Sequence, residues 1–96
     1  MKTAGPGKQW HHIVEQTPGN VKRFGGEALH NTENITALNE GVHTDVSAFY
    51  SSIREGITGS NTLTIRRWLG TQSYEAQRRF GLKAIENIGR GTWKVR

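Results

Sequence analysis

The sequence predicts a small α+β fold, because two short β-type segments come first and helix-type spacing fills the rest of the chain. Residues 9–14 and 34–38 are short, apolar and contain β-branched side chains, as half-buried strands do. From residue 40 onwards, apolar side chains recur every three or four positions, as on the buried face of a helix. Ninety-six residues suffice for one domain with one modest core.

Turn-forming residues separate the two predicted strands. Residues 17–20, Thr-Pro-Gly-Asn, carry strong turn chemistry and end the first strand. Residues 21–33 are expected to form a loop, with at most a helical turn at 28–29, because two adjacent glycines favour backbone freedom. The second strand, 34–38, is expected to pair back on residues 10–14.

Three helices are expected after the second strand. Asn39 is a good N-cap for a helix over about residues 40–52, whose apolar face places His43 at its edge, towards the strands. A second helix is expected from about residue 61 or 62 to Gly70, and a third over about 71–88, ended by Gly89. The aromatic core candidates are Trp10, Phe49, Tyr50, Trp68 and Phe80, with a tail around Trp93 and Val95 packed onto the domain.

Charge is distributed unevenly along a chain of net charge +5. Residues 1–48 carry four Lys or Arg against five Asp or Glu, whereas residues 49–96 carry nine against three. A basic half beside a histidine-bearing half favours a polyanion as the partner, although an Arg-rich solvated helical surface gives the same composition. The chain has no cysteine, so any metal must be held by imidazole, carboxylate, amide or water.

The N-terminal residues have the composition of a linker. Residues 1–8 are interpreted as a linker or the remnant of a longer polypeptide, and they lack the apolar run of a signal peptide. No segment approaches membrane-spanning length, so we expect a soluble protein.

Two adjacent histidines in the first strand provide the chemistry. His11 and His12 would point to opposite faces of a strand unless they lie at its end. One imidazole can then bind a cation together with His43, while the other acts as a general base. Asn34 is expected to orient that base through a hydrogen bond between its side-chain amide, which can donate or accept, and the imidazole.

Only two histidines would be metal ligands in this arrangement. Structural zinc takes four protein ligands and catalytic zinc usually three, and Ser47 stands where a further helix ligand would follow His43. Water and substrate phosphate must then complete the coordination. One loosely held divalent ion is therefore expected, with Mg²⁺, Mn²⁺ or Ni²⁺ favoured and Zn²⁺ as an alternative.

The run His11-His12-Ile13-Val14, with Asn34 twenty-two positions after His12 and His43 nine positions later, resembles the HNH, or His-Me finger, nuclease motif. It is similar in particular to the HH-type nuclease domains at the C-termini of bacterial polymorphic toxins. The resemblance implies a ββα-metal hairpin-helix core with additional C-terminal helices. It implies His12 as the base, Asn34 as its orienter, and His11 and His43 as metal ligands.

The resemblance divides the nuclease domain, 9–96, into a finger over 9–53 and a basic helical part over 54–96. Glu15 stands where many family members have proline, so it is either a polar participant near the metal or a solvent-facing strand end. His30 is interpreted as a loop residue that hydrogen-bonds backbone, with metal binding as the alternative. Four arginines are expected to contact phosphates: Arg66, Arg67, Arg78 and Arg79.

The function implied is that of a metal-dependent endonuclease with little sequence specificity, acting on DNA in preference to RNA. As an interbacterial toxin domain it would be monomeric, be delivered within a larger effector to the cytoplasm of a target cell, and have an acidic immunity protein as its inhibitor. Three alternatives stay open: a ribonuclease toxin with the same site, a non-catalytic nucleic-acid-binding module, and a zinc-stabilised interaction domain.

Overall fold

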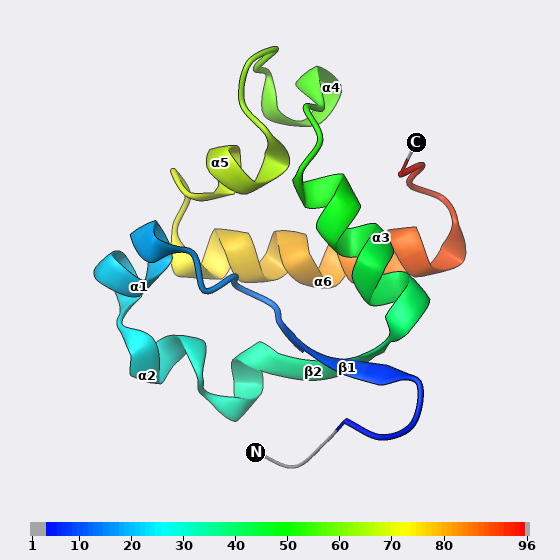
Figure 1. Cartoon of the computed structure of the whole chain (residues 1–96). Helices are drawn as coiled ribbons and strands as arrows, with labels where there is room; N and C mark the ends of the chain where they lie inside the picture. The colour runs from blue at the N-terminus through cyan, green and yellow to red at the C-terminus, as the bar shows by residue number, and fades with distance from the viewer. Residues whose placement is uncertain (1–3, 96) are drawn as a thin grey trace.

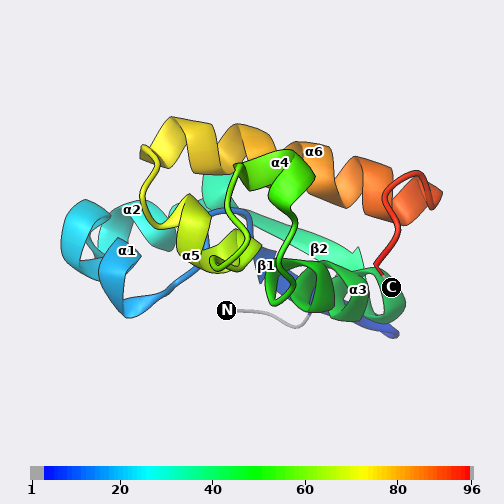
Figure 2. The same ribbon diagram turned by 90° about the horizontal axis from the view of Figure 1, so that it is seen from above.

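The computed structural model describes residues 4–95, which form an α+β fold with a two-stranded antiparallel sheet, as the sequence predicts (Figure 1). The elements, in chain order, are β1 (Lys8–His12), α1 (Pro18–Phe24), α2 (Gly26–Leu29), the 3-10 turn η1 (Thr32–Asn34), β2 (Ile35–Asn39), α3 (Glu40–Tyr50), α4 (Glu55–Thr58), α5 (Ile65–Leu69) and α6 (Tyr74–Arg90). Helix α6 runs behind the hairpin and α3, and α1 and α2 lie at one end of the sheet (Figures 1 and 2).

The hairpin is shifted relative to the predicted strands. Lys8 pairs with Asn39 and His12 with Ile35, so Lys8 belongs to the sheet and not to the linker expected over residues 1–8. Residues 13 and 14, predicted as part of the first strand, lie outside β1. Asn34, predicted to begin the second strand, is the last residue of η1. The strand after His12 is replaced by an irregular segment that Asn34 holds, as described below.

The loop prediction for residues 21–33 was wrong in its first part. Residues 18–24 are helix α1, with Thr17 as N-cap accepting a hydrogen bond from the Asn20 amide and Pro18 at the first turn. Thr-Pro-Gly-Asn suits a helix start as well as a turn, because proline has the helical φ and needs no amide partner at this position. The helical turn expected at residues 28–29 is present as α2.

The predicted helices are present with revised ends. Asn39 caps α3 as expected, accepting from the Gly41 amide, whereas α5 begins later, after Thr64. Helix α6 continues past Gly89 to Arg90, and its C-cap is Gly91, whose φ of 78° is the left-handed conformation that glycine adopts readily.

One hydrophobic core joins the finger to the basic helical part. It is built by residues of α3, α5 and α6, namely Val46, Phe49, Tyr50, Ile65, Leu69, Ala84 and Ile88, with Trp68, Phe80, Trp93 and Val95 packed against it. Trp10 is 38% exposed, so its assignment to the core was wrong. The finger and the basic part are therefore built around a shared core.

Helix α6 closely approaches the chain just after the histidine pair. A Cβ atom on Gly81 would lie 2.7 Å from the Ile13 carbonyl oxygen and 2.8 Å from Ile13 Cγ2. The missing side chain thus lets α6 support the backbone next to His12. Among the residues described, no helix is both long and apolar enough to cross a membrane.

Candidate active site

Side chains from β1, the following loop and α3 surround one open pocket of about 170 Å³. The residues lining it are Trp10, His11, His12, Glu15, Gln16 and His43. His12 is the last residue of β1, where the regular alternation of strand side chains stops. Both adjacent histidines line this pocket.

His11 and His43 face one another at the base of α3. Their ring centroids are 5.5 Å apart in an edge-to-face arrangement, and His11 is only 7% exposed. Burial, followed by the nearby His43 and His12, lowers the pKa of His11 to about 4. His11 is therefore neutral at pH 7, and its buried Nε2 has no hydrogen-bond partner among the described residues.

These two rings suit a metal that takes few protein ligands. A neutral imidazole with an unpartnered nitrogen can offer a lone pair to a cation. Within residues 4–95, no group of three or more His, Asp or Glu side chains is arranged to hold a metal. A divalent ion on His11 and His43 would thus need water or phosphate oxygens for the rest of its coordination.

His12 lies against a different partner. Its ring centroid is 5.3 Å from that of His30, again edge to face. Burial, and secondly His30, lowers the pKa of His12, and its Nε2 has no hydrogen-bond partner in the described part of the chain. A neutral imidazole with an uncommitted nitrogen is the form that a general base requires.

His30 is bonded through its side chain and not, as predicted, to backbone. Its Nε2 lies 2.8 Å from Gln16 Nε2, so the two side chains share a hydrogen bond at the rim of the pocket. His30 and His43 thus lie against different members of the histidine pair. This separates His30 from the proposed ligand pair of His11 and His43.

Asn34 does not bond the imidazole as predicted, because its amide is occupied by backbone. The side chain is fully buried; Oδ1 accepts from the Val14 amide at 2.8 Å, and Nδ2 donates to the carbonyls of Val14 and Leu29, each at 3.0 Å. The Ile13 amide also donates to the Asn34 carbonyl at 2.8 Å. Asn34 therefore fixes the two residues after His12, and it positions His12 through the backbone.

Glu15 is half-buried and paired with an arginine. Its carboxylate accepts two hydrogen bonds from Arg66, from Nε at 2.8 Å and from Nη2 at 3.1 Å, and Arg66 Nη1 donates to Ser51 Oγ at 2.7 Å. Arg66, predicted to contact phosphate, is thus paired with an acid that lines the pocket. Burial, and secondly Glu15, raises the pKa of the core residue Tyr50, whereas Arg66 acts in the opposite direction.

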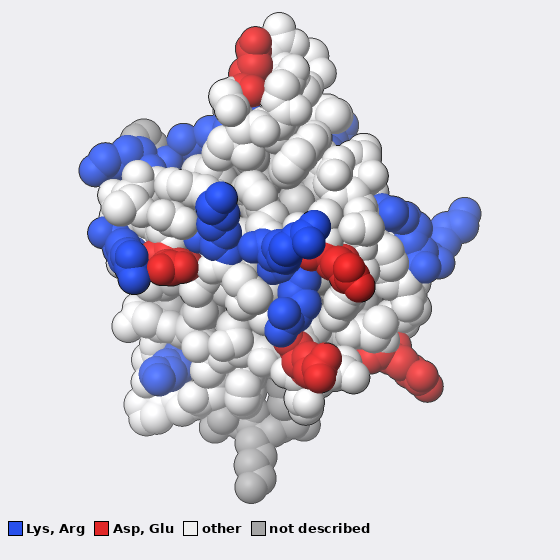
Figure 3. Space-filling model, turned by 180° about the vertical axis from the view of Figure 1, so that it is seen from behind, with Lys and Arg blue, Asp and Glu red and all other residues white. Residues whose placement is uncertain are grey.

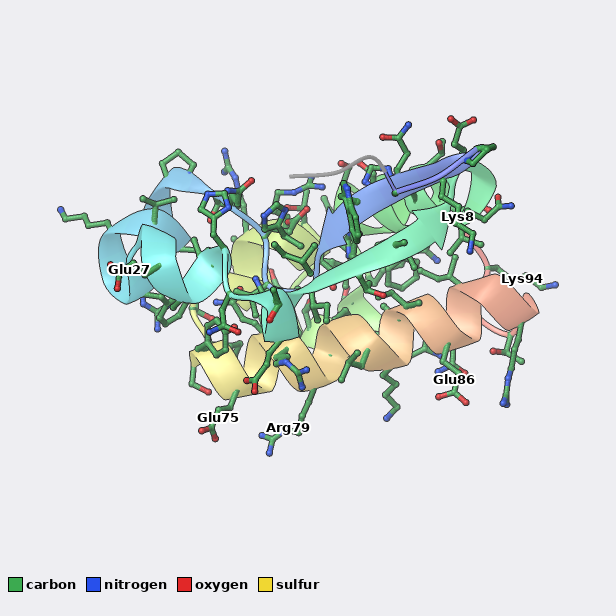
Figure 4. The ribbon with its side chains drawn as sticks, turned by 90° about the horizontal axis from the view of Figure 1, so that it is seen from below. Lys8, Glu27, Glu75, Arg79, Glu86 and Lys94 are labelled. Atoms are coloured by element: carbon green, nitrogen blue, oxygen red, sulfur yellow. The ribbon has the colours of Figure 1, made fainter. Side chains whose placement is uncertain are left out.

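The other predicted phosphate contacts belong to other surfaces. Arg78 donates to the Glu33 carbonyl at 2.9 Å, and Arg79 extends from α6 away from the hairpin (Figure 4). On the face opposite to Figure 1, Lys and Arg side chains form a band with acidic side chains among them (Figure 3). Arg67 is exposed on α5. Of these four arginines, Arg66 contacts a residue that lines the histidine pocket.

Gln16 also lines the pocket but was not predicted as a site residue. Its position four residues after His12 is the one signal that could have indicated it. Comparison with protein-family models, with curated proteins and with solved structures finds no match to this chain. The chemistry of the pocket is therefore argued from its own geometry.

Proposed function

We propose that the chain is a metal-dependent endonuclease whose hairpin and α3 form a ββα-metal, or His-Me finger, core. The observation that carries this proposal is the pocket that His11, His12 and His43 line together, in which His11 and His43 face one another. The buried Nε2 atoms of His11 and His12 both lack a hydrogen-bond partner among residues 4–95. The pairing of β1 with β2, followed directly by α3, gives the order hairpin then helix.

In the proposed reaction His12 removes a proton from a water molecule in the pocket. The water oxygen forms a bond to the phosphorus of a phosphodiester as the bond to the 3′-oxygen breaks in line with it. The 3′-oxygen leaves with the bonding electron pair and takes a proton from solvent water, so the products are a 5′-phosphate and a 3′-hydroxyl, and the proton taken by His12 returns to solvent. Asn34 keeps the chain after His12 in place by bonding Val14, and the absence of a side chain on Gly81 lets α6 lie against Ile13.

His11 and His43 would hold the divalent ion, Mg²⁺, Mn²⁺, Ni²⁺ or Zn²⁺. When bound, such an ion stabilises negative charge on the phosphoryl and leaving oxygens. The burial of His11 keeps its ring neutral at pH values where an exposed histidine is partly protonated. The protein therefore keeps this ring ready to bind a cation.

DNA is the preferred substrate of this proposal, with RNA as the alternative. The net charge of +5 supports binding to phosphates, which confers little sequence specificity. We further propose that the chain is the toxin domain of an interbacterial effector, acting in the cytoplasm of a target cell and neutralised by an acidic immunity protein. These last points rest on the resemblance of the histidine motif.

Cleavage of supercoiled plasmid tests the proposal. The protein is incubated with Mg²⁺, Mn²⁺, Ni²⁺ or Zn²⁺, with a chelator, and with structured RNA in a parallel series. Cutting that needs a metal supports the nuclease, and the RNA series decides the substrate. Plasmid binding without cutting under every metal would reject the nuclease and favour a binding module, whereas unfolding by the chelator would favour a zinc-stabilised domain.

A further inference from the structure

His30, at the end of α2, contacts the candidate base. Its ring centroid lies 5.3 Å from that of His12, and the two ring planes are 84° apart. Edge-to-face pairs of this kind place the positive edge of one ring against the negative face of the other. The contact therefore favours one orientation of the His12 ring over rotation about its side-chain bonds.

One buried amide connects the chain beside His12 to the chain beside His30. Asn34 Oδ1 accepts from the Val14 amide at 2.8 Å, and Asn34 Nδ2 donates to the Leu29 carbonyl at 3.0 Å. Val14 lies two residues after His12, and Leu29, which is fully buried, directly precedes His30. The two backbone segments that carry the rings are thus held together by the same side chain.

A second contact fixes the ring of His30. Its Nε2 lies 2.8 Å from Gln16 Nε2, and Gln16 follows His12 by four residues and lines the histidine pocket. A carboxamide can donate from its nitrogen or accept at its oxygen, so Gln16 can bond this ring nitrogen with or without a proton on it. His30 is therefore fixed at its backbone and at its ring, even though it is an exposed residue.

We propose that His30 is a positioning residue, whose ring holds the imidazole of His12 in the orientation in which it removes a proton from water. This inference rests on the proposed function and adds a residue to its site. His30 lies against His12, whereas His11 and His43 face one another. The described residues that line the pocket do not include His30, so it acts through His12 and not on the substrate. Loss of the His30 ring should slow the chemical step and leave metal and substrate affinity unchanged.

Single-turnover cleavage of a fluorescent DNA separates positioning from substrate binding. The full chain is compared as wild type, His30→Ala and His30→Phe, in the metal that supports cutting, over a range of protein concentrations. His30→Phe keeps an aromatic ring but loses the ring nitrogens. Thr32→Ala is the matched control, because Thr32 is an exposed residue two positions further along the chain.

His30→Ala should lower the cleavage rate at saturating protein by about tenfold, which is the upper end of what one aromatic pair contributes, with the half-saturating concentration within about twofold of wild type. His30→Phe should restore the rate to within about threefold of wild type, and Thr32→Ala should not change it. A His30→Ala rate equal to that of wild type, an equally slow His30→Phe, or a change confined to the half-saturating concentration would overturn the inference.

The contact between the two rings is measured without cleavage. Proton–carbon NMR spectra of the metal-free protein, labelled in histidine, give ring signals that are assigned to His12 by their loss in His12→Ala. These signals should move in His30→Ala, because the ring current of His30 is removed, and stay in place in Thr32→Ala. Unmoved His12 signals in His30→Ala would also overturn the inference. Cutting by the wild type with an unaffected His30→Ala rate rejects this role alone, whereas no cutting by the wild type under any metal rejects the proposed function and this role together.

Discussion

The contact between α6 and the histidine strand can be tested with two glycines of the same helix. A Cβ on Gly81 would lie 2.7 Å from the Ile13 carbonyl oxygen, whereas a Cβ on Gly89 would meet nothing within 4 Å. Alanine stabilises a helix interior by about 0.5–1 kcal/mol relative to glycine, so Gly89→Ala should stabilise the protein slightly. In Gly81→Ala the same gain is outweighed by an overpacking cost of about 1–3 kcal/mol, because backbone must move.

The two variants should therefore differ in free energy of unfolding by about 2 kcal/mol, with Gly81→Ala the less stable. For a domain of this size that corresponds to roughly 8–16 °C in Tm, measured by circular dichroism. Gly81→Ala should also slow cleavage, because Ile13 adjoins His12. Equal Tm values for the two variants would refute the close approach of α6 to Ile13.

Three further perturbations address other parts of the site. Asn34→Ala leaves the Val14 amide and the carbonyls of Val14 and Leu29 without their partner. The free energy of unfolding, measured in urea, should fall by about 2–4 kcal/mol. A loss below about 0.5 kcal/mol would show that these hydrogen bonds do not hold the chain after His12. The metal-free protein should lose stability as pH falls from about 6.5 to 4. In this range His11 binds a proton in the unfolded chain, whereas burial lowers its pKa to about 4 in the folded protein and keeps it neutral. The loss is at most roughly 3 kcal/mol, and urea midpoints should show less acid sensitivity in His11→Gln; an unchanged pH profile would contradict the burial of a neutral ring. Glu15→Gln removes negative charge beside the pocket, so nucleic-acid binding measured by fluorescence anisotropy at low salt should become tighter. The free energy of unfolding should change by less than about 1 kcal/mol. Weaker binding would contradict this view of Glu15.

Local sequence signals predicted much of the fold. Asn39 was correctly identified as the cap of α3, and the period of apolar residues located the three-helix core. The start of α1 was missed because Thr17 and Pro18 belong to residue types that serve turns and helix starts alike. Which of the two structures forms depends on packing against the remainder of the chain, and a local sequence pattern contains no information on that packing.

The contacts that complete the site are long-range, and this explains why they could not be read from spacing. Glu15 and Arg66 are 51 residues apart, and the partners of Asn34 are backbone groups, which every residue offers. The exposure of Trp10 depends likewise on what the remainder of the chain leaves uncovered. The residue types of the pocket could be predicted from the histidine motif, but the partners that position them required the structure.

The most direct test of the nuclease proposal is single-turnover cleavage of a fluorescent DNA by wild type and His12→Ala in the metal that supports cutting. Leu82→Ala serves as the surface control, because Leu82 is an exposed residue of α6. Calorimetry measures metal binding by each protein. Loss of a general base should lower the His12→Ala rate by about 10²–10⁴-fold, with folding and metal affinity retained and Leu82→Ala unchanged. Cleavage by His12→Ala at the wild-type rate would contradict the assignment of His12 as the catalytic base.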